Sequence, residues 1–320
     1  MKIDYDITEE ILKEHDCLEE IDKKESKQET KFKQRARLQQ SIWRIEQGLS
    51  KGWIIPSEKS NKKVRSSGCR IEYNKSNPSS YNFLDEQIVD EVNRRMRNPE
   101  PHQMIRKRRL WSNLLSSMPM CFNLFGMLRQ DKLKSSSLLR KWIPDIPGNL
   151  YAIRFEWSPG RSIPGQFLEN RSAFDCAIEF RTGNKTFGIL GIETKYHEHA
   201  AKEKSITIKR LNRYKVIAKN SGIFKSGAIK EILGSNLQQI WQDHLLVLSM
   251  LQHSSNKWNW GKFILVHPEK NPSFAEAGEK YKELLMNNDS TFEVRTIESV
   301  LKSEILPLDI EKKFRHRYLW

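Results

Sequence analysis

Residues 171–199 read RSAFDCAIEFRTGNKTFGILGIETKYHEH, and the interpretation of the whole chain starts from this stretch. Two runs with the composition of strands, 173–180 and 186–196, are joined by a turn that contains glycine and asparagine. A buried charge costs free energy unless it is paired or bound to a metal. The charged residues that stand in these apolar surroundings are Asp175, Glu193 and Lys195.

Strand geometry brings the three charges together. Residues two apart in a strand point to the same face, so Glu193 and Lys195 share a face. If the hairpin turns around Asn184, Asp175 lies opposite or nearly opposite Glu193, with Cβ atoms about 5 Å apart. Two carboxylates that close repel each other unless a cation lies between them. Oxygen ligands from Asp175, Glu193 and the main-chain carbonyl of Thr194 suit Mg²⁺, so we predict a magnesium site.

The lysine beside this site indicates the chemistry. Lys195 is placed to orient or deprotonate a water molecule, or to stabilise charge on a phosphorane. A metal, a lysine and a basic protein together indicate phosphodiester hydrolysis. The alternative is a set of surface ion pairs, because an Asp followed by Glu-x-Lys is common by chance. The flanking sequences CAIEF and FGILGI are apolar on both faces, which favours the metal site.

The net charge also indicates a nucleic-acid partner. The 320 residues carry a formal net charge of +15, which predicts a polyanionic partner, with a basic protein that has none as the alternative. Residues 1–30 hold eleven acidic residues against five lysines, whereas residues 31–75 hold twelve basic residues against three glutamates. We interpret the acidic start as a solvated helix; the alternative is a mimic of nucleic acid that shields the basic face.

Two basic stretches, 31–44 and 105–109, are predicted to contact phosphate. Two nearby tryptophans, Trp43 and Trp111, either stack on bases or, as we favour, fill a helix core. The predicted phosphate contacts are Lys33, Arg35, Arg37, Arg44, Arg106, Lys107, Arg108 and Arg109.

The cysteines and the apolar runs indicate the compartment. Four cysteines lie far apart and lack the paired spacing of metal sites. Three of them sit beside apolar or structured stretches, and we expect these three to stay reduced. The N-terminus lacks the apolar core of a signal peptide, and no apolar run is long enough to span a bilayer. These features predict a cytoplasmic protein without membrane contact.

The order of the predicted elements defines the fold class. Helices come first, then three consecutive strands, then helix, strand, helix and strand, which implies some parallel pairing with helices on the sheet faces. We predict an α/β core of three layers with a mixed central sheet, preceded by a mainly helical N-terminal region. The N-terminal region spans 1–100 and the core 101–310. Residues 56–82 are expected to form a loop, and Pro119 and Gly126 to break an apolar segment.

The spacing of Asp175 and the Glu193-Thr194-Lys195 triplet, on the second and third strands of an α/β core, resembles the PD-(D/E)xK nuclease signature. The resemblance implies a restriction-endonuclease-like core and Mg²⁺-dependent cleavage of DNA, with Mn²⁺ as a substitute. Phe174 stands where the pattern has a proline. Ordered blocks over roughly residues 30–300 resemble one bacterial branch of the superfamily: KFKQRARLQQSIWRIEQG, LLSSMPMCFNLFG, RFEWSPG, FDCAIEF, GILGIETKYHE and LQQIWQDHLL.

The resemblance adds further candidates. Relatives often add an upstream acidic residue, for which Glu156 is the candidate, with a strand-edge charge as the alternative. Relatives that grip a DNA end often place a glutamine on the helix after the core. Gln239 is therefore expected to contact water or phosphate, with a satisfied amide as the favoured alternative, and Gln242 lies on the same helix. His197 is a ligand, a phosphate contact or, as we favour, a strand-end residue near solvent; Glu198 is expected to have a structural role.

These observations predict a metal-dependent deoxyribonuclease, an endonuclease in restriction, anti-phage defence or repair. One alternative is a DNA-binding module that kept the fold and works through a partner. The intact triad of Asp175, Glu193 and Lys195 argues against this alternative. Another is a ribonuclease with the same chemistry. Besides DNA, the expected partners are a second copy of the chain, because double-strand cutting usually needs two active sites, and a partner protein in a defence system.

Overall fold

The computed structural model describes most of the chain, and the expectations for residues 1–6 and 20–30 of the acidic start lie outside the described part. The described residues are 7–19, 31–56, 61, 63–100, 102–161, 163–203 and 205–320.

A five-stranded sheet in the order β3-β4-β5-β6-β7 lies at the centre of the molecule. The first three strands pair antiparallel, whereas β6 pairs parallel to β5 and β7 pairs parallel to β6, so the sheet is mixed as predicted. The strands are β3 (Asn149–Trp157), β4 (Phe174–Arg181), β5 (Phe187–Thr194), β6 (Trp258–His267) and β7 (Phe292–Thr296).

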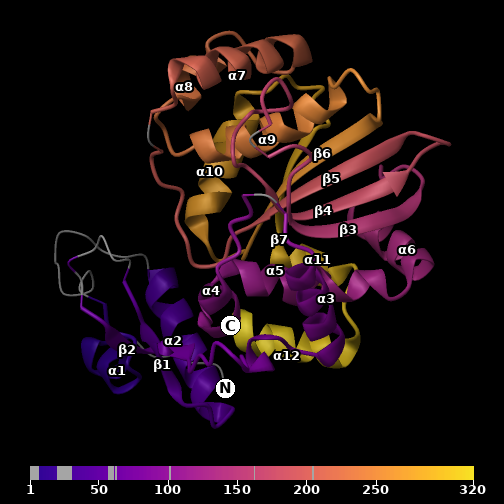
Figure 1. The fold of residues 1–320 in the computed structure, drawn as a ribbon. Coiled ribbons are helices and arrows are strands. Elements are labelled where there is room, and N and C mark those ends of the chain that lie inside the picture. Colours follow the sequence, from indigo (N-terminus) through magenta and orange to yellow (C-terminus); the bar gives the residue numbers. More distant parts are fainter. Residues whose placement is uncertain are drawn as a thin grey trace.

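Helices cover both faces of this sheet (Figure 1). Successive side chains of a strand point to opposite faces. Ala177 and Ile189 therefore pack against α7, α9 and α10, while Ile178 and Leu190 join the cluster formed with α5, α6, α11 and α12. The predicted three-layer α/β architecture is confirmed. The helices are α5 (Ser117–Phe125), α6 (Lys132–Trp142), α7 (Ile208–Ser221), α8 (Ala228–Ile232), α9 (Gln238–Leu251), α10 (Pro272–Glu283), α11 (Ile297–Lys302) and α12 (Leu308–Tyr318).

The N-terminal region is mainly helical, but it also contains a small antiparallel sheet. One strand of this sheet lies within 56–82, so the prediction of a loop throughout that stretch is wrong. The polar composition of this stretch gave no sign of a strand, because segments distant in the sequence stabilise it. The carbonyl of Gly68 accepts a hydrogen bond from Arg44, and its N–H donates to the carbonyl of Asp16. The elements are α1 (Glu9–Glu14), α2 (Lys31–Glu46), β1 (Lys51–Ile54), β2 (Arg65–Ile71), a 3₁₀ turn (Ser80–Asn82) and α3 (Glu86–Arg97).

Two helices, α4 (Lys107–Ser112) and α5, connect this region to α6 and the sheet. Pro119 was expected to break the apolar segment, but it is the third residue of α5. The first four N–H groups of a helix have no partner within it, so proline costs little there. Gly126 ends α5 as expected. The remaining elements are α4 (Lys107–Ser112) and a 3₁₀ turn (Gly126–Arg129).

In the described part of the chain, no helix combines the length and the apolar character needed to cross a membrane. All four cysteines are buried free thiols, whereas only three were expected to stay reduced.

Candidate active site

The β4–β5 hairpin brings the predicted carboxylates together. Cys176 pairs with Ile192, so the next residues outward, Asp175 and Glu193, are neighbours at the open end of the hairpin. The predicted cross-strand placement is confirmed. Glu193 and Lys195 are each only 9% exposed, and Asp175 is partly buried. The charged residues of the triplet thus lie at the end of a buried hairpin.

Hydrogen bonds fix the orientation of these side chains. The main-chain N–H and the hydroxyl of Thr194 both donate to Asp175 Oδ2, at 2.9 and 2.7 Å. Lys195 Nζ donates to Glu193 Oε1 at 2.7 Å. Gln239, from α9, donates through Nε2 to the same Glu193 oxygen at 3.4 Å. The structure therefore brings the predicted Gln239 together with the triad.

Burial disfavours the ionised form of each carboxylate in the site, and the charge of Asp175 adds to this effect at Glu193 and Glu156. Burial raises the pKa of Asp175 above its ordinary value, although Lys195 opposes the shift. Burial, followed by the charge of Asp175, raises the pKa of Glu193 well above its ordinary value. The same two causes, in the same order, raise the pKa of Glu156. A cation bound among these groups would stabilise their ionised forms.

A pocket of about 430 Å³ opens beside the hairpin, and Glu156, Asp175 and Glu193 line it. Glu156 lies on β3, where its backbone adopts a φ of +49°, an uncommon value for a residue other than glycine. Arg161 Nη2 lies 3.3 Å from its carboxylate. The candidate upstream acid is thus in the pocket and paired with an arginine, on the edge strand of the sheet.

Sequence reasoning missed several residues that line this pocket, and the charged ones among them are Arg171, Glu203, Arg210 and Asp243. Asp243 lies one helical turn after Gln239 on α9, and that spacing was the available signal. Arg171 and Arg210 belong to no motif and were not singled out. With them, the pocket combines carboxylates with guanidinium groups, which are suited to binding a cation and a phosphate side by side.

The donor set fits Mg²⁺. Among the residues that the structure describes, no group of three or more His, Cys, Asp or Glu side chains is placed to hold a metal. Mg²⁺ does not require such a cage, because it keeps several waters and is bound through one or two carboxylates plus substrate phosphate. Asp175 and Glu193 supply that pair. Burial disfavours their ionised forms, as does the charge of Asp175 at Glu193, and a bound cation would stabilise those ionised forms.

Comparison with known proteins identifies the family. A family model of the PD-(D/E)XK nuclease superfamily matches residues 27–320, nearly the whole chain. The chain belongs to this superfamily. No curated protein and no solved structure matched the chain. The mixed sheet with helices on both faces is therefore a restriction-endonuclease-like fold, and membership indicates a nuclease with a nucleic-acid substrate.

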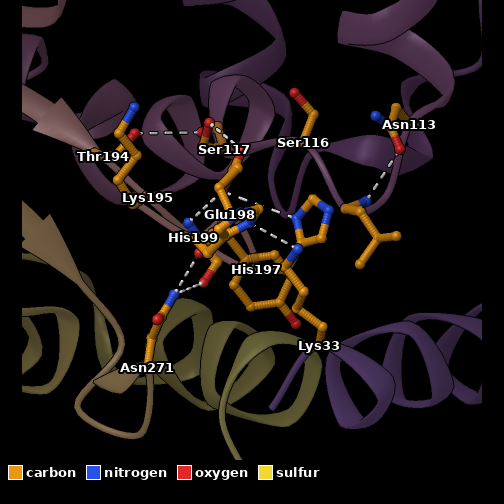
Figure 2. A network of polar contacts seen from close by, with 12 residues as sticks. Lys33, Asn113, Ser116, Ser117, Thr194, Lys195, His197, Glu198, His199 and Asn271 are labelled. Carbon is orange, nitrogen blue, oxygen red and sulfur yellow. Dashed lines mark hydrogen bonds and ion pairs between the residues drawn. The ribbon is translucent and has the colours of Figure 1, made fainter. Parts of the chain in front are cut away.

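Glu198 anchors the segment that follows the triplet of this nuclease (Figure 2). Its Oε2 accepts the main-chain N–H of Tyr196 at 2.8 Å, and its Oε1 accepts the hydroxyl of Ser117 at 3.2 Å. Burial opposes ionisation, but the charges of His197 and Lys195, together with main-chain hydrogen bonds, lower the pKa of Glu198. An ionised Glu198 thus joins the loop after Lys195 to the start of α5, in agreement with its expected structural role.

The segment beyond the strand carries His197. β5 ends at Thr194, and His197 Nδ1 lies 3.8 Å from the carboxylate of Glu198. The side chain of His197 is 26% exposed, and it does not line the pocket. This placement fits the favoured interpretation of a strand-end residue near solvent.

The predicted phosphate contacts on α2 divide into two groups. Arg37 and Arg44 are buried, with Nε donating to the carbonyls of Cys17 and Gly68, each at 2.9 Å. The structure therefore gives these two arginines a role in packing, because buried guanidinium groups present no surface to phosphate. Lys33 lies 2.9 Å from His199 Nδ1 on the segment after the triplet, and Arg35 is partly buried.

The predicted contacts at α4 lie nearer the surface. Arg106, Lys107 and Arg109 are exposed, and Arg108 lies over the ring of Tyr73. Arg109 donates to Ser116, and its Nη2 lies 3.9 Å from Glu198 Oε1, so it reaches the segment after the triplet. Both tryptophans, Trp43 and Trp111, are only 6% exposed, which confirms the favoured helix-core interpretation.

Proposed function

We propose that this protein is a Mg²⁺-dependent deoxyribonuclease in which Asp175 and Glu193 hold the ion and Lys195 assists the reaction. The convergence of these three side chains carries the proposal: Asp175 and Glu193 line the pocket, and Lys195 donates to Glu193. Bound Mg²⁺ supplies a Lewis acid that polarises the phosphoryl oxygen and lowers the pKa of water. Mn²⁺, a hard cation that takes the same oxygen ligands, is expected to replace it.

The residues around the ion have distinct roles in this proposal. Thr194 keeps Asp175 oriented through two hydrogen bonds, and its main-chain carbonyl is a third proposed ligand. Lys195 is held as an ammonium by its ion pair with Glu193, which favours stabilisation of phosphorane charge over deprotonation of water. Gln239 orients Glu193 and donates toward water or phosphate, and Glu156 adds negative charge to the pocket.

DNA is the proposed substrate, and the basic surface near the pocket supports it. Arg171 and Arg210 in the pocket, with the exposed side chains at α4, offer guanidinium groups to successive phosphates. The net charge of +15 favours a polyanion of either kind, so a ribonuclease is the second candidate. We assign the enzyme to restriction or anti-phage defence in the cytoplasm, where buried free thiols stay reduced, and expect a homodimer or a partner protein.

Cleavage of supercoiled plasmid with Mg²⁺ tests the proposal. We expect the wild type to cut, and Lys195→Ala to cut at least about 100-fold more slowly while binding plasmid equally well. A chelator should abolish cleavage. Lys185→Ala, in the exposed turn at the other end of the hairpin, should behave as wild type.

The same assay separates the alternatives. DNA binding without chelator-sensitive cleavage would contradict the nuclease and support a non-catalytic binding module. Cleavage of RNA but not of DNA by the same triad would assign the chain as a ribonuclease.

A further inference from the structure

The small N-terminal sheet, formed by β1 and β2 beside α2, carries an exposed apolar strip (Figure 1). Ile54 of β1 pairs with Arg65 of β2. The next residues outward, Ile55 and Val64, are therefore neighbours across the two strands. Trp53 lies two residues before Ile55 and shares its face. These three side chains, which we call the Trp53 strip, are 53%, 51% and 56% exposed in the order Trp53, Ile55 and Val64.

The exposure of Trp53 is unusual within this chain. All nine tryptophans lie in the described ranges, and Trp53 is the only exposed one. Scattered exposed apolar residues need no explanation, whereas neighbouring ones on a single face indicate a binding surface.

A cluster of arginines adjoins the Trp53 strip. The arginine cluster consists of Arg65 and Arg70 of β2 with Arg108 and Arg109 of α4. Burial lowers the pKa of Arg70, and the positive charges of the other three lower it further. Arg65 is ion-paired with Glu19, but Arg70 and Arg108 are not ion-paired with any carboxylate of the described residues. Like charges gathered in this way repel one another unless a polyanion binds them.

The arginine cluster connects the small sheet with the proposed active site. Arg70 forms a β-bridge with Asn113, the residue after α4, so β2 and α4 are held together. At the other side of α4, Arg109 Nη2 lies 3.9 Å from Glu198 Oε1, on the segment that follows Lys195. A basic path therefore extends from the Trp53 strip along α4 to the segment after the triplet.

We propose that the Trp53 strip and the arginine cluster form a second DNA-binding surface, which holds the duplex away from the cleaved phosphate. It rests on the proposed function for the identity of its ligand. The arginines bind phosphates, and the strip packs against bases or sugars in a groove, which a two-stranded β-ribbon can enter. Charge favours DNA over a second copy of the chain, because a two-fold contact through this surface would bring arginines against arginines.

Binding of duplex DNA by the full chain, with cleavage blocked by a chelator, tests this surface. Trp53→Ala should bind about tenfold more weakly with little change in the salt slope, because it removes an apolar contact. Trp53→Phe, which keeps an aromatic ring, should recover most of the affinity. The matched control is Leu308→Ala, which truncates a leucine 68% exposed on α12 and should bind as the wild type does. Equal affinities of Trp53→Ala and Leu308→Ala would overturn the proposal.

The arginine cluster has its own measurement. Arg70→Gln should lower the salt slope of log K by about 1, the loss of one phosphate contact. Lys312→Gln removes an exposed cation from α12 and should leave the slope unchanged. Sedimentation of the wild type and of Trp53→Ala tests the other occupant. If Trp53→Ala turned a dimer into a monomer and left DNA binding unchanged, the strip would bind a second copy and the proposal would be wrong.

The outcomes also separate this inference from the proposed function. If the wild type cuts plasmid and Trp53→Ala binds DNA as Leu308→Ala does, only the second surface is lost. If the wild type does not cut, but Trp53→Ala binds DNA more weakly than Leu308→Ala, the nuclease is lost and the DNA-binding surface is retained.

Discussion

Each acidic residue of the triad is held by at least one donor from another segment of the chain. Asp175 receives the N–H and the hydroxyl of Thr194 on the next strand, and Glu193 receives Lys195 and, from α9, Gln239. These charge-assisted hydrogen bonds partly offset the cost of burial and orient both carboxylates. Both donors of Thr194 bind Oδ2 of Asp175. If asparagine replaced Asp175, one of the two orientations of its amide would place the NH₂ group, itself a donor, against them.

A different buried residue, His244 on α9, ties protonation to folding. Its Nδ1 lies 3.0 Å from the hydroxyl of Tyr281, and its Nε2 lies 2.8 Å from the hydroxyl of Thr291. Thr291 donates its own proton to Asp289, so its oxygen accepts from Nε2 and Tyr281 donates to Nδ1. This arrangement requires a neutral ring, and burial lowers the pKa of His244 from 6.5 to about 4.

We predict that His244 makes folding sensitive to acid. The unfolded histidine takes up a proton near pH 6.5, whereas the folded one does so near pH 4. The neutral His244 therefore contributes on the order of 3 kcal/mol to the free energy of unfolding. This contribution is complete above pH 6.5 and is lost as the pH falls toward 4. Urea unfolding at pH 7 and pH 4.5 should show a smaller loss of stability for His244→Gln than for the wild type. A variant at the exposed His102 should match the wild type; equal losses in His244→Gln would contradict the prediction.

At the scale of elements, the hairpin was predictable and α2 was only partly so. The pairing of Asp175 with Glu193 follows from local rules, namely the two-residue period of strands and a short turn. The helical pattern of α2 was also evident, but its surface was not. Arg37 and Arg44 are buried because main-chain carbonyls from α1, β2 and their flanks accept their hydrogen bonds. Such acceptors come from other segments, so the periodicity of one helix does not reveal them.

The same limit applies to Asp243. A single carboxylate on an apolar helix belongs to no motif. Its place in the pocket depends on contact with a hairpin that precedes it by about fifty residues. The structure supplies that contact by packing α9 against β5 and β6. Local patterns thus identified the residues of the hairpin, whereas residues brought in by packing needed the fold.

Helix α7 lies beside the pocket and provides the next prediction. Arg210 lines the pocket, whereas its neighbour Lys209 points to Glu169, with Nζ 3.6 Å from the carboxylate. With cleavage blocked by chelator, Arg210→Ala should bind duplex DNA more weakly and lower the salt slope of log K by about 1, the loss of one phosphate contact. Lys209→Ala removes the same charge one residue away and should change both less. Equal effects of the two variants would place the DNA elsewhere.

At the scale of the whole molecule, α12 joins the N-terminal region to the nuclease core. Leu38 of α2, Ile88 of α3, Ile178 of β4 and Phe314 of α12 belong to one continuous apolar cluster. Figure 1 shows α12 beneath the sheet, on the side of the N-terminal helices. The predicted division into 1–100 and 101–310 was based on composition along the chain. Composition gives no information about contacts between the two ends of the chain.

Arg317 on α12 makes this junction testable. The side chain is fully buried, its Nε donates to Gln40 at 3.1 Å, and its Nη1 donates to the carbonyl of Asn82 at 3.0 Å. Its guanidinium also lies 4.2 Å from the ring centroid of Trp43. All three partners belong to residues 1–100, so the last helix of the chain is bonded to the region that precedes the core.

We predict that Arg317→Met destabilises the molecule as a single unit. Removing the donor leaves two buried side-chain acceptors, Gln40 Oε1 and Asn82 Oδ1, unsatisfied, at about 1–3 kcal/mol each. Tryptophan fluorescence and far-ultraviolet circular dichroism should report one coincident denaturant transition, shifted to lower midpoint. Arg315→Met, on the exposed side of the same helix, should shift it much less. Two separate transitions, of which Arg317→Met shifts only one, would instead show that residues 1–100 unfold independently of the nuclease core.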